Sequence, residues 1–350
     1  MKIFSMRETT LFKVAIIALL GIALHGCKKP SNGIDNNEVV TKPYSLFIGD
    51  SSGAIYNTSD GVNFKHLDFG FDGTPCRAIT TSGNNLLMIK VNAFVRVGND
   101  KNFNPLWSEN KVDPTRYYQP QIFDVLSFKR IYFAANSGNG VWYSDTSGAQ
   151  STWVNDNDIN LSGSTITSYT QLEDGTLIGF CDGDRSAVFN KSSTMAPWVR
   201  VASTGLPGGG QFYVTHLKNM IIAGDYSGTN GVWYSSNKGA TWQQFNGLPA
   251  NAPVLSMNPA FEQALLVGTN SGIYRLTINT ATFLSSNVGI GANAIVRGLV
   301  QKYDQYKNGQ IKQYVYAATS VGLYRSEDLG LNWVQMVSTT LPATNFTAIY

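Results

Sequence analysis

The chain has 350 residues, enough for one large or two ordinary domains, and its 43% hydrophobic content can build a real core. Only 14% of the residues are charged, against about 25% in an average soluble domain. The N-terminal leader holds three of the 26 basic and one of the 23 acidic residues, so 23 basic residues face 22 acidic ones after it. That balance excludes the basic footprint of a nucleic-acid-binding protein.

Residues 1–26 have the pattern of a secretory leader. Lys2, Arg7 and Lys13 form a basic start, and the apolar run 14–24 is shorter than the roughly 20 residues of a membrane-spanning helix. The run ends in Leu-His-Gly-Cys at 24–27, which resembles the lipobox of bacterial lipoproteins. The resemblance implies that Cys27 is acylated and becomes the new N-terminus, attached to the membrane by its acyl chains. The alternative is an ordinary signal peptide with an incidental cysteine.

Residues 27–43 are polar and show no apolar periodicity, so they predict a flexible tether that reaches about 20 Å by coil statistics. Lys28 stands where an aspartate would indicate retention in the inner membrane. We therefore expect a lipid-anchored protein of the cell envelope, at the outer membrane.

From Tyr44 onward the sequence can be aligned with itself. Each unit has two apolar strands, a glycine-containing loop, a short strand that ends in an aromatic residue and a hydroxyl, and a turn to another aromatic residue. Seven units fit this pattern, at 44–64, 76–97, 122–148, 166–190, 212–242, 254–276 and 296–326. The 34 glycines and 17 tyrosines of the chain suit many short strands and tight turns.

The first unit lacks its opening strand, and a strand without a unit stands at the other end. The segment LPATNFTAIY at 341–350 matches LPANAPVLSM at 248–257, which opens a complete unit. A ring closes in this way, because the last strand fills the gap in the first sheet. The sequence therefore predicts an all-β fold over 44–350, a single seven-bladed β-propeller of four-stranded blades closed by the C-terminal strand.

A short motif follows the third strand of several units. In one copy it is Ser235-x-Asn237-x-Gly239-x-Thr241-Trp242; other copies carry Ser326, Asp328, Gly330 and Trp333, or Ser144, Gly148 and Trp153, and a weaker one carries Asn57, Ser59, Gly61 and Phe64. The hydroxyl and carboxylate or amide groups suit bonds to nearby backbone N–H groups, glycine permits positive φ, and the aromatic residue can be buried between sheets. The motif resembles the Asp-box, or BNR, repeat and predicts structural turns.

The opposite face, which carries the interblade linkers, usually holds the site in proteins of this resemblance. The longest linker there offers Arg116, Tyr117 and Tyr118, and two loops offer Asp182 and Asp225 with Tyr226. Aromatic rings beside carboxylates suit stacking on sugars and hydrogen bonds to their hydroxyls. A long surface loop whose tyrosines pack on their own blade is the alternative.

A second candidate comes from the repeat alignment. One position in each first strand lies between an apolar residue and a small one, and we expect it to face the central channel. This channel column is Arg77, Asp124, Thr167, Tyr213, Leu255, Arg297 and Thr347. Two arginines with Asp124 and Tyr213 could hold a carboxylate or phosphate by charge-assisted hydrogen bonds. The alternative is a water-filled channel that binds no ligand, because such a channel also needs polar side chains along its wall.

The resemblance implies three classes of function. Sialidases and xyloglucan hydrolases carry Asp-boxes, but the sequence lacks the sialidase F/Y-R-I-P motif and a recognisable carboxylate pair. Sorting-receptor ectodomains and a photosystem assembly factor are binders. We therefore expect a monomeric, non-catalytic propeller that binds a glycan or an envelope protein, with a glycoside hydrolase or an envelope scaffold as alternatives. No cofactor or metal is expected, since His66 and His216 have no cysteine cluster, and Cys76 and Cys181 are expected to be buried thiols.

Overall fold

The fold is built almost entirely from short antiparallel strands. The computed structural model describes residues 39–67, 73, 75–82, 85–90, 93–98, 105–109, 122–125, 130–134, 141–144, 154–155, 166–181, 187–192, 196–277, 280–291, 293–342 and 345–350. In these residues the strands form seven sheets, and the only helical element is a 3-10 turn, η4 (Ala260–Glu262). The described residues include no helix long and apolar enough to cross a membrane.

Six of the sheets have four strands each. The first sheet is β29 (Phe346–Ile349), β2 (Leu46–Asp50), β3 (Ile55–Thr58) and β4 (Lys65–Leu67). The second is β5 (Cys76–Ser82), β6 (Asn85–Lys90), β7 (Ala93–Gly98) and β8 (Pro105–Glu109). The third is β9 (Ile122–Val125), β10 (Arg130–Ala134), β11 (Val141–Ser144) and β12 (Val154–Asn155).

The remaining sheets follow in chain order. The fourth is β13 (Ile166–Gln171), β14 (Leu177–Cys181), β15 (Val188–Lys191) and β16 (Val199–Arg200). The fifth is β17 (Phe212–Leu217), β18 (Met220–Asp225), β19 (Val232–Ser235) and β20 (Gln243–Gln244). The sixth is β21 (Ser256–Asn258), β22 (Ala264–Thr269), β23 (Gly272–Thr277) and β24 (Leu284–Ser285). The seventh is β25 (Val296–Tyr306), β26 (Ile311–Thr319), β27 (Gly322–Ser326) and β28 (Val334–Met336), to which β1 (Val40–Lys42) adds a fifth strand.

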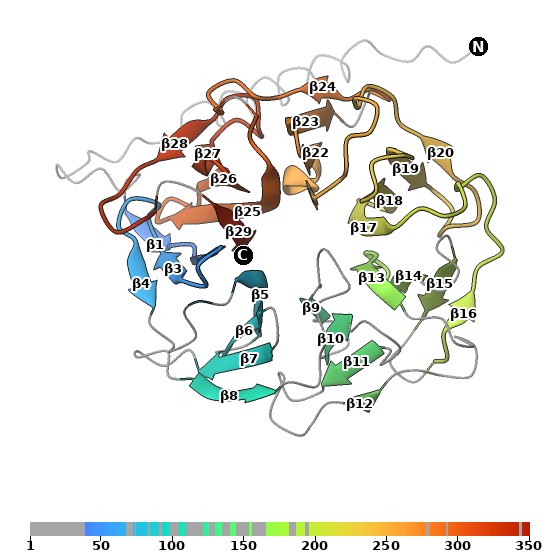
Figure 1. The fold of residues 1–350 in the computed structure, drawn as a ribbon, viewed down its shortest axis with the longest axis horizontal. Helices are drawn as coiled ribbons and strands as arrows, with labels where there is room; N and C mark the ends of the chain where they lie inside the picture. The colour runs from blue at the N-terminus through green and yellow to red at the C-terminus, as the bar shows by residue number, and fades with distance from the viewer. Residues whose placement is uncertain are drawn as a thin grey trace, which may run out of the picture.

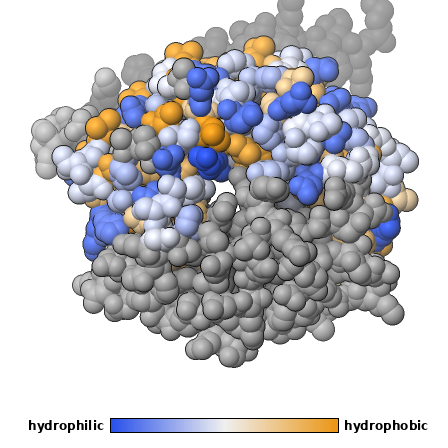
Figure 2. All heavy atoms as spheres, viewed as in Figure 1, coloured by the Kyte–Doolittle hydropathy of each residue, from blue (hydrophilic) through white to orange (hydrophobic). Residues whose placement is uncertain are grey.

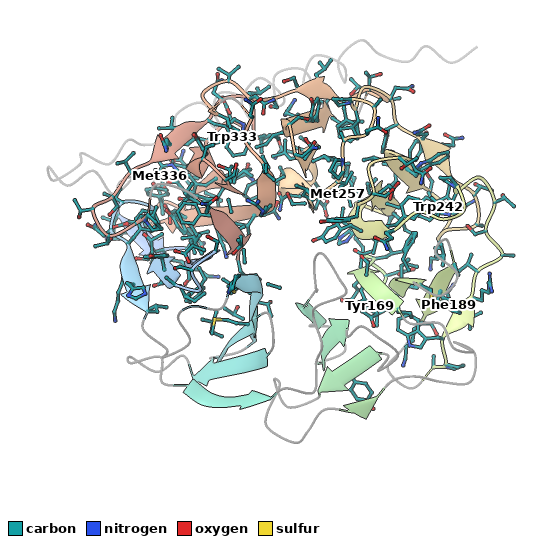
Figure 3. The ribbon with its side chains drawn as sticks, viewed as in Figure 1. Tyr169, Phe189, Trp242, Met257, Trp333 and Met336 are labelled. Carbon is teal, nitrogen blue, oxygen red and sulfur yellow. The ribbon has the colours of Figure 1, made fainter. Side chains whose placement is uncertain are left out.

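The sheets stand side by side around a common centre (Figure 1), with the first strand of each sheet toward the centre and the fourth toward the outside. Neighbouring sheets share their cores. One cluster joins Leu217 and Ile222 of the fifth sheet to Met257 and Leu265 of the sixth. Trp242 and Trp333 lie toward the outside of the ring and Met257 toward its centre (Figure 3). The apolar area that stabilises the fold is therefore buried between sheets.

Several second strands are buried along their whole length, since each has a strand on both sides and a neighbouring sheet over each face. All six residues of β22 and all five of β2 and β14 are buried. Small residues near their ends let the neighbouring first strand approach. A Cβ at Gly224 would lie 2.5 Å from Val254 Cγ1, and one at Gly49 would lie 2.7 Å from Cys76 Cβ. Both lengths are below van der Waals contact, so these positions require glycine.

A repeated backbone contact links each of several sheets to the next. The Trp242 N–H donates to Thr204 O at 3.0 Å, the Phe283 N–H to Asn246 O at 2.8 Å and the Trp333 N–H to Val288 O at 2.9 Å. Each acceptor is followed by a glycine at positive φ, at Gly205, Gly247 and Gly289. Thr340 lies in the segment that enters the first sheet, and its hydroxyl donates to Phe64 O at 2.7 Å.

The two ends of the described chain meet in adjoining sheets. β29 pairs with β2, with Phe47 and Tyr350 exchanging backbone bonds of 2.7 and 2.9 Å. β1 pairs with the end of β25, so that Val40 lies opposite Tyr306. The tether predicted for 27–43 is therefore wrong at its end, because residues 40–42 are a strand. The pairing partner lies more than 260 positions away in the chain, and no local pattern indicated it.

Candidate ligand-binding site

The motif predicted as an Asp-box in the fifth sheet uses its polar groups internally. Ser235 Oγ accepts the N–H of Gly239 at 2.9 Å and donates to Asn237 Oδ1 at 2.9 Å. Asn237 Oδ1 also accepts the Thr241 N–H at 2.9 Å. Gly239 has φ +90°, and the buried Trp242 indole donates to its carbonyl oxygen at 2.9 Å. The turn is satisfied without a ligand.

The predicted Asp-box of the seventh sheet has the same geometry. Ser326 Oγ accepts the Gly330 N–H at 2.8 Å, and Asp328 Oδ1 accepts the Asn332 N–H at 2.9 Å. Burial opposes ionisation, but the bonds from the Asn332 side chain and backbone hold the pKa of Asp328 below its usual range. Trp333 is buried and its indole donates to Ser286 O at 2.9 Å. Of the copy at 144–153, Ser144 ends β11, whereas Gly148 and Trp153 lie outside the described residues.

The weak copy in the first sheet has a different register from the predicted one. The hydroxyl is that of Thr58, which accepts the Gly61 N–H at 3.0 Å, and the carboxylate is that of Asp60, which accepts the Asn63 N–H at 2.8 Å. Asn57 instead bonds Leu46 O across the sheet. The hydroxyl residue and the glycine are three positions apart here and four apart in the other two described copies. This difference moved the predicted alignment by one residue.

The boxes lie on the same face as the turns between first and second strands. Lys238, inside the box of the fifth sheet, forms an ion pair of 2.5 Å with Asp174, in the turn between β13 and β14. We call this side the Asp-box face. The linkers between sheets and the loops between second and third strands therefore lie on the opposite side, the linker face.

Asp225, predicted as a ligand-binding carboxylate on the linker face, has a structural role instead. It is fully buried, and its two oxygens accept bonds from the backbone N–H groups of Ser227 and Asn230 and from both of their side chains, at 2.6 to 3.0 Å. Asp50 holds the corresponding loop of the first sheet in the same way. Tyr226 is partly buried beside this loop. Asp182, Arg116, Tyr117 and Tyr118 lie outside the described residues.

The channel column coincides with breaks in strand pairing. In β5, Cys76 lies opposite Lys90 and Ala78 opposite Ile89, so Arg77 is an inserted residue of a β-bulge. The same two-against-one register places Thr167, Arg297 and Thr347 at bulges of β13, β25 and β29. Asp124 and Tyr213 keep regular pairs, with Ile131 and Gly224. Bulges re-aim a side chain and are frequent next to functional sites.

The bulges lie where the first strands begin, next to the linkers. The backbone there bonds across sheets: Thr347 Oγ1 donates to Cys76 O at 2.7 Å and Ser256 Oγ to Val296 O at 3.2 Å. Tyr213 and Arg297 are partly buried, whereas Leu255 is 9% exposed and contributes an apolar position. The side chains of Arg77, Asp124 and Thr167 lie outside the described part. Figure 2 shows an opening at the centre of the ring with hydrophilic atoms at its described edge.

Other expected features have simple environments. Cys76 and Cys181 are both buried thiols outside any disulfide, and Cys76 Sγ donates to Ala78 O at 3.6 Å. A hydrogen bond of 2.8 Å joins His216 Nδ1 to Thr170 Oγ1, and burial lowers the pKa of the imidazole. No group of three potential metal-ligating side chains occurs among the described residues.

Comparison with known proteins identifies the fold class. No family model matches the sequence, and no curated protein matches it. One similar structure is the extracellular domain of a candidate one-component system from B. thetaiotaomicron, with 13% identity over 88% of this chain and 48% of that chain and a TM-score of 0.50. Another is YCF48 bound to D1 peptide, with 10% identity over 86% and 91% of the two chains and a TM-score of 0.53.

A third is a candidate 6-phosphogluconolactonase from Bacteroides uniformis, with 14% identity over 87% of this chain and 98% of that chain and a TM-score of 0.57. The chain spans about half the length of the first of these three proteins, at 48%. At such identities the likeness concerns the fold alone. Together with the antiparallel sheets around one centre, it places the chain in the β-propeller class.

Proposed function

We propose that this chain is a single seven-bladed β-propeller, closed by its C-terminal strand, that binds a glycan or protein ligand at the linker-face mouth of the channel without catalysing a reaction. The seven antiparallel sheets, six of four strands and one of five, and the pairing of β29 with β2 support the closed ring. We further propose that acylation of Cys27 anchors this propeller to the cell envelope, at the outer membrane.

The observation that carries the binding site is the ring of β-bulges. Four first strands insert one residue at the aligned position of the channel column, and two of the inserted residues, Arg77 and Arg297, are arginines. A bulge interrupts the regular hydrogen bonds between two strands. Because bulges recur at the same aligned position in four first strands, they support a role other than sheet stability. A propeller axis is also the place where several blades can reach one ligand.

The chemistry of the channel column favours a ligand group that carries a carboxylate or phosphate. The guanidinium groups of Arg77 and Arg297 supply planar donors for such an anion, and the Tyr213 hydroxyl adds a further donor. Asp124 suits a hydroxyl or an N–H of the same ligand. The linker tyrosines Tyr117 and Tyr118, with Arg116, suit stacking at the edge of this site. Tyr226, in the loop between β18 and β19, adds an aromatic side chain. YCF48, one of the structural neighbours, is described with a bound peptide.

The test is a ligand screen followed by paired substitutions. A glycan array and affinity capture from envelope extracts identify a ligand, and Arg77→Ala with Arg297→Ala is then expected to weaken it by about tenfold or more. The control is Lys65→Ala with Arg200→Ala, which removes two exposed cations from the outer strands β4 and β16. Unchanged affinity in the channel variant would refute the channel site. Turnover of glycosides by the wild-type chain would instead favour the hydrolase alternative.

A further inference from the structure

The hairpin of the seventh sheet extends past the rest of its sheet on the Asp-box face. The third strand, β27, ends at Ser326, opposite Val315. β25 and β26 continue for four more pairs, from Lys302 opposite Tyr314 to Gln305 opposite Ile311. At about 3.4 Å per residue, the hairpin reaches on the order of 15 Å farther than its neighbour. We call residues 302–313, with the paired residues 39–42, the hairpin extension.

The chain enters the propeller along this hairpin extension. The Lys307 N–H donates to Val39 O at 2.9 Å, and Thr41 Oγ1 donates to Gln305 O at 3.1 Å. The Tyr44 N–H then donates to the buried Asp304 carboxylate at 3.3 Å, which leads the chain into β2. Residue 39 is therefore fixed near the hairpin tip, so the N-terminal segment begins at this point of the Asp-box face.

The hairpin extension is basic and exposes apolar side chains. It contains Lys42, Lys302, Lys307 and Lys312 against one acidic residue, Asp304, which is buried and also accepts a bond from the Tyr314 hydroxyl. Lys42 and Lys307 are exposed, and Lys312 bonds to Glu327 outside the extension. Val39, Val40, Tyr303 and Ile311 are 39% to 53% exposed. These are four of the eleven exposed large hydrophobic residues in the described part of the chain, gathered in sixteen positions.

The distance to the proposed lipid is short. Eleven residues, 28–38, separate Cys27 from Val39. Fully extended they span at most about 40 Å, and as a coil they average about 20 Å end to end. An acylated Cys27 therefore holds the hairpin extension close to the lipid surface, whereas the linker face lies on the other side of the ring.

We propose that the hairpin extension rests on an anionic lipid surface, which turns the Asp-box face toward the membrane and the linker face away from it. The proposal rests on the proposed anchoring at Cys27. Lysines are attracted to anionic headgroups, and tyrosine and aliphatic side chains suit the interfacial region beneath them. The anchor supplies proximity, and the hairpin extension supplies the orientation that leaves the ligand site accessible to a partner.

The first test uses the unacylated chain, residues 28–350, with lipid vesicles. Co-sedimentation is expected with vesicles containing phosphatidylglycerol and not with pure phosphatidylcholine, and it should weaken as salt increases. Lys42→Glu with Lys307→Glu should weaken binding by about 25-fold or more, since each lysine near such a surface contributes about fivefold. The matched control, Lys65→Glu with Arg200→Glu, makes the same change of charge on the outer strands and should bind like wild type.

Binding that is equal for both vesicle types, absent from both, or lost equally in the control variant would overturn the proposal.

The second test measures orientation in the acylated full chain. Fluorophores on Gln310→Cys, at the hairpin turn, and on Ser227→Cys, on the linker face, are compared in vesicles with nitroxide-labelled headgroups; the native Cys76 and Cys181 are buried. Stronger quenching at position 310 is expected, and equal or stronger quenching at 227 would contradict it. Fatty-acid labelling tests the anchor separately, so failure of anchoring and failure of the lipid contact give different results.

Discussion

At the scale of single residues, Lys302 carries its charge in an unfavourable place. Its ammonium lies 4.5 Å from the centre of the Tyr350 ring, and burial lowers the pKa of Lys302 to about 8 from 10.5. Between these two values the unfolded chain binds the proton and the folded chain does not. Lys302 therefore makes the free energy of unfolding rise with pH from about 8 to 10.5, and its cost is fully present below pH 8.

We expect Lys302→Met to raise the free energy of unfolding at pH 7 by about 1 to 3 kcal/mol, because it removes the buried charge and keeps the apolar stem. Urea unfolding of both chains at several pH values provides the measurement. The difference between variant and wild type should shrink as the pH passes from 8 to 10.5. A gain that does not change with pH would attribute the effect to packing rather than to charge.

A second residue-scale prediction concerns the glycines that link neighbouring sheets. Gly247 has φ +93°, and a Cβ there would overlap the Phe283 carbonyl oxygen. Gly247→Ala should lower the free energy of unfolding by about 3 kcal/mol or more. Gly309→Ala is the matched control, because Gly309 has φ +83° and no atom beyond its chain neighbours lies within 4 Å of the place that a Cβ would take. It should cost about 1 kcal/mol, and equal losses in the two variants would show that the contact with Phe283 O contributes nothing.

At the scale of elements, the C-terminal strand has the largest expected effect. Phe346 and Ala348 of β29 are buried in the clusters that the first sheet shares with its two neighbours. Deleting 341–350 should leave β2 without its inner partner and strongly destabilise the fold. Thermal melting of the truncated chain beside the chain 28–350 measures this effect. Similar melting temperatures would contradict closure by this strand.

The other element-scale prediction concerns the leader. Cys27→Ser should abolish incorporation of a fatty-acid analogue in cells, because a hydroxyl cannot replace the thiol that the proposed acylation requires. The control is Cys76→Ser, which changes a buried thiol and should leave labelling unchanged. Incorporation that persists in Cys27→Ser would favour the ordinary signal peptide.

The elements also show what the sequence could predict. The boxes at Ser235 and Ser326 were recognisable because the bonds that form the turn itself, from the hydroxyl and from the Asn or Asp side chain, join residues two to four positions apart. The register at Thr58 was not, because one missing residue changes which side chains coincide. Asp225 was wrongly predicted to bind a ligand, because the sequence does not distinguish a carboxylate that accepts bonds within its own loop from one that faces solvent. Neither β1 nor the bulges leave a local pattern, since each depends on a partner strand.

At the scale of the whole molecule, the β-propeller class followed from the periodicity, because each unit can bury its apolar strands only against the next unit. The identity of the ligand could not be predicted from the repeat, because positions that stabilise the ring and positions that line its centre recur with the same period. The sequence predicted that the seven positions of the channel column are equivalent in the repeats, but not which of them bind a ligand. Which of its members touch a ligand depends on side chains contributed by several sheets, and this remains a proposal to be tested by Arg77→Ala with Arg297→Ala.

The pairing of β29 with β2 has a consequence for how the molecule comes apart. In a linear array of repeats, unravelling begins at an end unit, which has one neighbour only. Here the first sheet takes its inner strand from the far end of the chain. In the closed ring proposed above, every sheet would therefore have a neighbour on each side, and none would be a terminal unit. Loss of structure must then begin by opening a sheet in place. The slow step of unfolding should accordingly be the parting of the two chain ends, after which the remaining sheets can separate in turn.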